Sequence, residues 1–199
     1  MSQQLGFDAL LADAKHVNDA RVFEKLAGHL PDTMEAALPF YRDLIARHNA
    51  AMLAADVKAA MGIREEARNL AIRLNGGTSC GIIADDEAPG CVLSARSAAP
   101  CGTIPLWGQD GSFTVTVEGM RVRVELEGLF GIGASFCYWP GFKAYIVDRD
   151  LPFFSETGFR SFLGSHAQAC PMTPEEFVTE TLSGHIRSLR KTRPVVQRR

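Results

Sequence analysis

The chain has 199 residues, a length that allows one large domain or two small ones. Apolar residues make up 46% and charged residues 22%, which is ordinary for a soluble globular protein. No apolar run approaches the roughly 20 residues that cross a bilayer, and residues 1–10 lack the basic start and apolar run of an export signal. From these features we expect a cytoplasmic protein with no membrane partner.

The formal net charge of −2 hides an uneven distribution. No acidic residue follows Glu180, but six basic residues do: Arg187, Arg190, Lys191, Arg193, Arg198 and Arg199. Clustered lysine and arginine can follow a phosphate backbone without reading its sequence, so nucleic acid is one possible partner of this basic tail. The alternative is a solubilising chain end, and no helix-turn-helix or RNA-binding signature accompanies the tail.

The first 77 residues predict a helical N-terminal region. Apolar residues at helical spacing run from Leu10 to Leu26, and Gly28 with Pro31 predicts the end of this helix. A second helical stretch begins after Asp32 or Thr33 as N-cap. Pro39 is expected to kink or divide it, and Gly62 is a second candidate for a break. Gly76 and Gly77 predict the end of the region.

Residues 76–112 are rich in glycine, proline, serine and alanine. A connection of this length without secondary structure is unusual in a compact domain. We therefore expect short strands around residues 81–84 and 91–94, joined by loops.

The clearest strand pattern lies in residues 112–128, where apolar and polar residues alternate strictly. Glu118-Gly119 predicts the tight turn of an antiparallel hairpin. Residues 134–148, "ASFCYWPGFKAYIVD", predict a second hairpin with Pro140-Gly141 at its turn. After it, "DRDLPFFSETGFRSFLG" predicts a loop and a short helix capped by Ser155, with four phenylalanines buried: Phe153, Phe154, Phe159 and Phe162.

The last predicted element is a helix with a strong start signal. Thr173 is the N-cap, Pro174 follows at the first helical position, and Glu176 completes a capping box. The whole pattern predicts an α+β fold, with a helical N-terminal layer (1–77) packed on an antiparallel sheet that a C-terminal helix closes (78–199). The two regions are expected to form one compact unit. The N-terminal helices carry enough apolar surface to form a homo-oligomer as well.

The charged residues after the sheet are the candidate ligand-binding site. Arg160 can meet an anion, or the carboxylates of Asp148, Asp150 or Glu156, and His166 follows in the next loop. The alternative interpretation is a salt-bridged surface loop, because exposed ion pairs contribute little to stability. Phe162 is expected to be core, with Arg160 as the functional edge of an otherwise structural segment.

Catalytic and metal chemistry have weaker support. Cys137 could act as a nucleophile with His166 as base, but reactive cysteines favour helix N-termini and exposed loops over strands. The five cysteines form no C-x-x-C pair, and His166-x3-Cys170 alone does not make a zinc site. We therefore expect no metal and no cofactor. The glycines of "GLFGIGAS" fit a bend better than a dinucleotide loop.

The segments "DRDLPFFSETGFRSFLG" and "MTPEEFVTETLSGHI" resemble an uncharacterised protein family of proteobacterial plasmids and integrative elements. The resemblance covers the last third of the chain and implies a bacterial, cytoplasmic accessory protein of mobile elements. It brings no catalytic residues with it. We expect a non-enzymatic binding or interaction module. The alternative is an enzyme with a polar site between the sheet and the Asp148–His166 loop.

Overall fold

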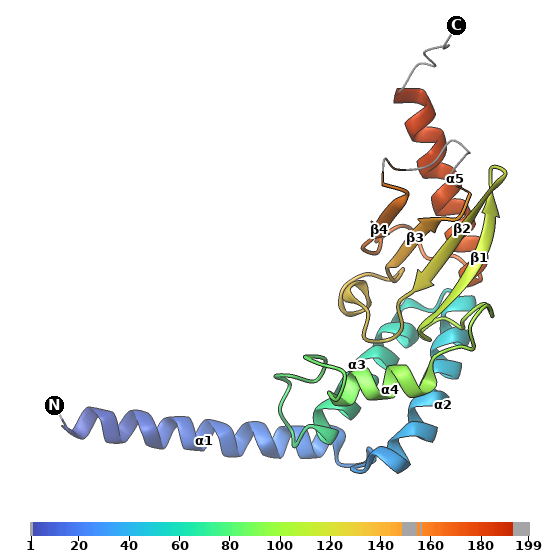
Figure 1. Ribbon diagram of the computed structural model, residues 1–199. Coiled ribbons are helices and arrows are strands. Elements are labelled where there is room, and N and C mark those ends of the chain that lie inside the picture. The colour runs from blue at the N-terminus through green and yellow to red at the C-terminus, as the bar shows by residue number, and fades with distance from the viewer. Residues whose placement is uncertain (1, 149–154, 156, 193–199) are drawn as a thin grey trace, which may run out of the picture.

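The computed structural model describes residues 2–148, 155 and 157–192, and it has the expected α+β architecture. A layer of helices lies at one end of the molecule, and a four-stranded antiparallel sheet covered by the last helix lies at the other (Figure 1). Among the described helices, none combines the length and apolar character needed to cross a bilayer.

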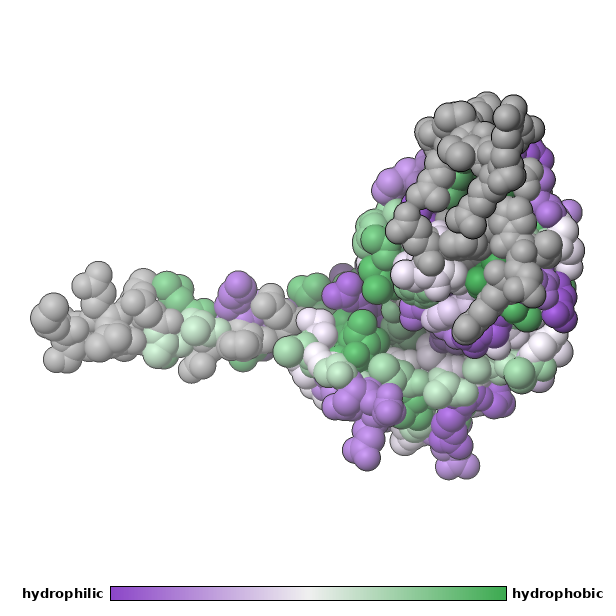
Figure 2. Space-filling model, turned by 45° about the horizontal axis from the view of Figure 1, so that its top comes forward, coloured by the Kyte–Doolittle hydropathy of each residue, from purple (hydrophilic) through white to green (hydrophobic). Residues whose placement is uncertain are grey.

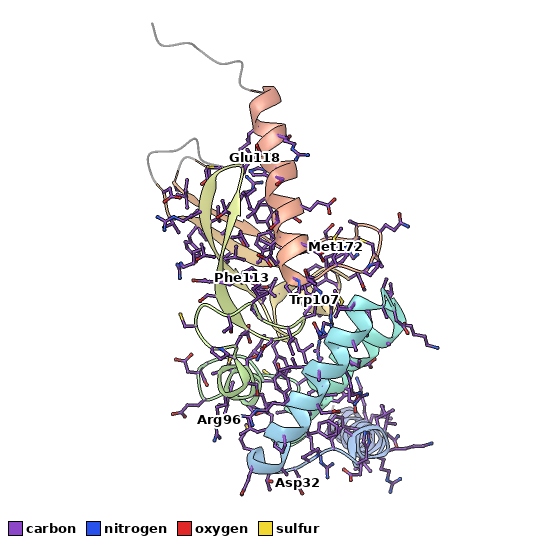
Figure 3. All side chains as sticks on the ribbon, turned by 90° about the vertical axis from the view of Figure 1, so that its right-hand side faces the viewer. Asp32, Arg96, Trp107, Phe113, Glu118 and Met172 are labelled. Atoms are coloured by element: carbon purple, nitrogen blue, oxygen red, sulfur yellow. The ribbon has the colours of Figure 1, made fainter. Side chains whose placement is uncertain are left out.

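The helical layer contains α1 (Ser2–Ala27), α2 (Met34–Leu53), α3 (Val57–Leu74) and α4 (Pro89–Ser97). Helix α1 projects from the rest of the molecule as a long arm, whereas α2 and α3 lie side by side and run in opposite directions (Figures 1 and 3). Pro39 does not divide α2, and Gly62 lies within α3. The break falls instead at Ala54–Asp56, where Ala55 has a φ of 54° and Asp56 caps α3.

Helix α4 corrects the prediction of short strands in this part of the chain. Residues 81–84 form turns, and residues 91–94 lie inside α4. Pro89 stands at the start of this helix, where its missing N–H has no helical partner to lose. Gly90 allows the first turn of α4 to lie close to the backbone of Ile82, because a Cβ at this position would lie 2.7 Å from the carbonyl oxygen of Ile82.

The sheet has the order β1 (Gly111–Val117), β2 (Met120–Leu126), β3 (Phe142–Ile146) and β4 (Phe159–Phe162), all antiparallel. The hairpin of β1 and β2 is confirmed, with Glu118 and Gly119 both at positive φ in its turn. The second hairpin was predicted wrongly. Pro140-Gly141 is not its turn, because β3 pairs with β2 and with β4.

Residues before β3 and around β4 also differ from the prediction. A short 3₁₀ helix, η1 (Ile132–Ser135), leads to Trp139, which forms an isolated bridge with Ser165. Phe159–Phe162 is a strand rather than a helix, and Ser155 donates to the carbonyl of Phe159 instead of capping a helix. Phe159 is exposed and Phe162 is half-buried, so the prediction that both are buried was wrong for Phe159. Phe153 and Phe154 lie outside the described residues.

Helix α5 (Pro174–Thr192) packs on one face of the sheet, and its predicted capping box is confirmed. The Glu176 backbone N–H donates to Thr173 Oγ1 over 3.3 Å, and the Thr173 N–H donates to Glu176 Oε2 over 2.8 Å. One continuous cluster of buried apolar residues includes α2, α3, the inner face of the sheet and α5. The helical layer and the sheet therefore share a core.

Candidate functional site

An exposed arginine of α2 bonds to the backbone of a second exposed arginine near the end of α4. Arg42 lies on the outer surface of α2, and its Nη2 donates to the backbone carbonyl of Arg96 over 3.2 Å. Because that carbonyl belongs to the last turn of α4, the arginine offsets the partial negative charge of the helix end. Figure 3 shows Arg96 at the edge of the helical layer, and both side chains are exposed. We call Arg42 and Arg96 the α2–α4 arginine pair.

Two other arginines of the helical layer, Arg47 and Arg73, are paired with carboxylates. Arg47 contacts Glu66 over 3.1 Å and Asp43 over 3.6 Å, and Arg73 contacts Glu24 over 3.1 Å. In contrast, neither member of the α2–α4 arginine pair has an ion-pair partner among the residues that the structure describes. Their remaining N–H groups are therefore available to an anion.

Arg64 of α3 has a structural role at the base of this layer. It is only 5% exposed, and its Nε donates to His48 Nε2 over 2.8 Å. Its terminal nitrogens donate to three backbone carbonyls after and within η1: Ala134 at 3.1 Å, Cys137 at 2.6 Å and Tyr138 at 2.7 Å. Each terminal nitrogen of the guanidinium thus bonds a carbonyl, which offsets the cost of burying the charge.

His48 of α2 extends this polar cluster to the loop before the sheet. Its Nδ1 lies 2.9 Å from the carbonyl oxygen of Trp107, and the neighbouring Asn49 side chain accepts from the Trp107 N–H over 3.1 Å. Burial, and then the charge of Arg64, lower the pKa of His48 from 6.5 to about 4. The imidazole is therefore neutral at physiological pH and joins α2 to the loop that carries Trp107.

A cavity of about 710 Å³ lies at the other end of the molecule, between β4, the chain after it and α5. Its lining includes Arg160, Phe162 and Trp139. Arg160 pairs with the buried Ala144 of β3, so it lies on the α5 face of the sheet. The predicted short helix is wrong here, because Arg160 lies in strand β4. It is exposed because β4 is the edge strand.

Asp148 and His166, the two other residues of the predicted ligand site that the structure describes, have different partners. Asp148 is bonded to Arg121 instead, with an N–O distance of 2.7 Å, and these bonds hold the pKa of its carboxyl below the usual value. Asp150 and Glu156 lie outside the described residues. His166 lies beside Cys137, with Nε2 3.7 Å from Sγ, and it is not part of the cavity lining.

The Cys137–His166 pair brings together the two residues considered for catalysis. Cys137 is only 4% exposed, and the sulfur packs against Gly164, whose Cβ would lie 3.3 Å from it. Within the described part of the chain, no carboxylate bonds to His166 to orient its ring. In that same part, no group of three or more metal-ligating side chains converges on one point. The geometry is that of a buried thiol covered by a surface histidine.

Comparison with known proteins points to the helical layer. Residues 22–96 match the family model described as the KlcB N-terminal DNA-binding domain. The resemblance noted in the last third of the chain placed the family match in the wrong region, because the matched segment runs from the end of α1 to Arg96 in α4.

The chain is similar to two proteins named Protein KlcB from Escherichia coli. One is 37% identical over 175 residues, which is 87% of this chain and 36% of that protein. The other is 34% identical over 174 residues, which is 86% of this chain and 41% of that protein. The chain thus spans about two-fifths or less of the length of these relatives. No solved structure matches it.

Proposed function

We propose that the chain binds DNA through its helical layer, with the α2–α4 arginine pair contacting phosphates. The observation that carries this proposal is the match of residues 22–96 to the KlcB N-terminal DNA-binding domain model. A DNA-binding role needs no catalytic group, which agrees with the expectation of a non-enzymatic accessory protein. The two KlcB relatives are longer than this chain. The proposal is therefore made for this chain and not for the full-length relatives.

The charge of the matched segment limits how it can bind DNA. Residues 22–96 contain eight lysine and arginine residues against ten aspartate and glutamate residues, so the segment is acidic as a whole. DNA affinity comes largely from cations that replace counterions on phosphates. Binding must therefore use a local group of cations rather than the overall field.

The α2–α4 arginine pair fits this requirement. The acidic run Asp85, Asp86 and Glu87 precedes the start of α4, whereas Arg96 stands near its end, about 10 Å along the helix axis from the first residue. Arginine presents a planar fork of donors that matches phosphate oxygens. Figure 2 shows hydrophilic side chains projecting from the lower side of the globular part of the molecule.

The test is fluorescence anisotropy with a labelled DNA duplex over a series of salt concentrations. Replacing Arg42 and Arg96 by alanine is expected to weaken binding and to lower the salt slope by about 2, one for each lost phosphate contact. The matched control replaces Arg121 and Arg123 on the outer face of the sheet, which removes the same charge. If this control weakens binding equally, the proposed interface is wrong.

The basic tail is the competing location for nucleic-acid binding. Replacing Arg193, Arg198 and Arg199 by alanine tests it in the same assay. If only this variant loses affinity, the tail carries the binding and the α2–α4 arginine pair does not.

The enzyme alternative has less support than either location for DNA binding, because Cys137 is buried and His166 has no orienting carboxylate in the described chain.

A homo-oligomer through the N-terminal helices is a second proposal, and it rests on the arm formed by α1. Five of its large apolar residues are exposed: Leu10, Leu11, Val17, Val22 and Leu26. Helices in proteins draw most of their stability from packing, which this arm lacks along most of its length (Figure 1). Sedimentation of the wild-type chain should show a dimer. The double variant Leu11→Glu, Val22→Glu should sediment as a monomer. A wild-type monomer at high concentration would contradict this.

A further inference from the structure

The cavity beside the edge strand has the size and composition of a small-molecule site. Its volume of about 710 Å³ falls within the range of roughly 300–1,000 Å³ that is usual for ligand pockets. It lies far in sequence from the segment matched to DNA-binding proteins, since its lining residues run from Trp139 to Gly184. Nothing in the proposed DNA contact uses it.

Aromatic rings form its walls. Phe142 and Phe162 stack with their ring centres 4.6 Å apart, and Trp139 and Phe177 stack at the same distance. Phe142 and Trp139 are almost completely buried, whereas Phe162 at the strand edge is half-buried. Phe162 is therefore the ring that a planar ligand can reach, with Phe142 stacked against it.

Arg160 supplies a cation at the strand end of the cavity. Its guanidinium carbon lies 5.5 Å from the centre of the Phe162 ring, so the charge is held above an aromatic face. Among the described residues, no carboxylate forms an ion pair with it. Glu180 lines the opposite wall on α5, so an anionic group is favoured at the Arg160 end and disfavoured at the helix.

We propose that this cavity binds a small aromatic acid. The planar ring packs against the accessible part of Phe162, and the carboxylate or sulfonate accepts hydrogen bonds from the Arg160 guanidinium. The ring supplies the apolar contact area, and the arginine fork fixes the orientation of the ligand. This proposal is independent of DNA binding.

The probe is 8-anilinonaphthalene-1-sulfonate, an aromatic sulfonate that fluoresces in apolar surroundings, titrated into the full chain. We expect saturable binding at one site and competition by 2-naphthoate, an aromatic carboxylate. Arg160→Ala should weaken both ligands about ten-fold or more, and Arg160→Lys by less, because lysine keeps the charge but not the fork. Arg123→Ala, which removes a cation from the outer face of the same sheet, is the matched control.

A second variant fills the cavity without removing a contact. A Cβ at Gly184 would meet no atom within 4 Å, and this residue lines the cavity from α5. Gly184→Leu should therefore abolish probe binding while leaving the melting temperature unchanged or higher, because leucine favours a helix more than glycine does. The proposal is overturned if the wild-type chain does not bind the probe, or if Arg160→Ala and Gly184→Leu both bind it as tightly as wild type.

Discussion

Arg64 Nε donates a hydrogen bond to His48 Nε2 over 2.8 Å, and this contact fixes the protonation state of the histidine. An arginine is always a donor, so His48 Nε2 must accept and can carry no proton. The other ring nitrogen, Nδ1, then carries the proton and donates to the carbonyl of Trp107 over 2.9 Å. Protonating His48 would break the contact and place two cations together in the core.

This relationship predicts that acid destabilises the fold. The pKa of His48 is about 4 in the folded chain and about 6.5 when the chain is unfolded, so the unfolded state binds more protons between these values. The free energy of unfolding should fall as the pH decreases from about 6.5 to about 4, by up to about 3 kcal/mol. Urea denaturation at several pH values measures this change in the free energy of unfolding. His48→Gln should lose this part of the dependence, and an identical profile in both proteins would contradict the assignment.

Arg64 is expected to be essential for stability. Arg64→Met leaves three carbonyls and His48 without their donor, and each buried unsatisfied group costs about 1–3 kcal/mol. The loss should be about 3 kcal/mol or more in denaturant unfolding. Arg64→Lys should rescue little, because one ammonium cannot reach the same set of acceptors. Arg68→Ala, an exposed arginine on the same helix, should change stability by less than about 0.5 kcal/mol.

Thr173→Ala should destabilise the chain by about 1 kcal/mol through loss of the α5 cap. The Oγ1 of Thr173 accepts from the Glu176 N–H and also donates to the Glu176 carboxylate over 2.9 Å, so alanine removes both bonds. Thr173→Ser keeps the hydroxyl and should therefore retain most of the stability that the alanine variant loses. A denaturation midpoint that is the same for alanine and wild type would show that this cap contributes nothing.

The thiols should all be free and should differ in reactivity. The structure has five free cysteines, of which Cys80 and Cys101 are exposed and Cys137 is buried. An aromatic disulfide reagent should modify the two exposed thiols first and Cys137 last. Burial and the nearby Asp86 and Asp85 raise the pKa of Cys91, which slows its reaction. Fewer than five thiols in the denatured, unreduced chain would contradict this expectation.

Elements with a strong local pattern were predictable from the sequence. The alternation in β1 and β2 and the Thr173-Pro174-Glu175-Glu176 cap each depend on a few neighbouring residues. Helix α4 was missed because nine residues that include Gly90 give little periodic signal, and Pro89 was its only local marker. Strand β4 was missed because its conformation depends on pairing with β3, and the paired residues are at least 14 positions apart in the sequence.

The candidate sites were predictable only in part. The sequence singled out Arg160 as a candidate ligand-binding residue, but it did not reveal the cavity that Arg160 lines, because Phe177 and Gly184 reach this cavity from α5. The α2–α4 arginine pair joins residues 54 positions apart through a backbone carbonyl, which has no sequence signature. The same holds for Arg64, whose acceptors are carbonyls that any residue would provide.

The bonds of Arg64 also set the order in which the chain can become native during synthesis. Its carbonyl partners lie 70–74 positions later in the sequence, so they leave the ribosome well after α3 has done so. Until Tyr138 has emerged, a completely packed helical layer would enclose a guanidinium with few acceptors. We therefore expect the helices to close completely around Arg64 only after the segment that ends at Tyr138 has emerged.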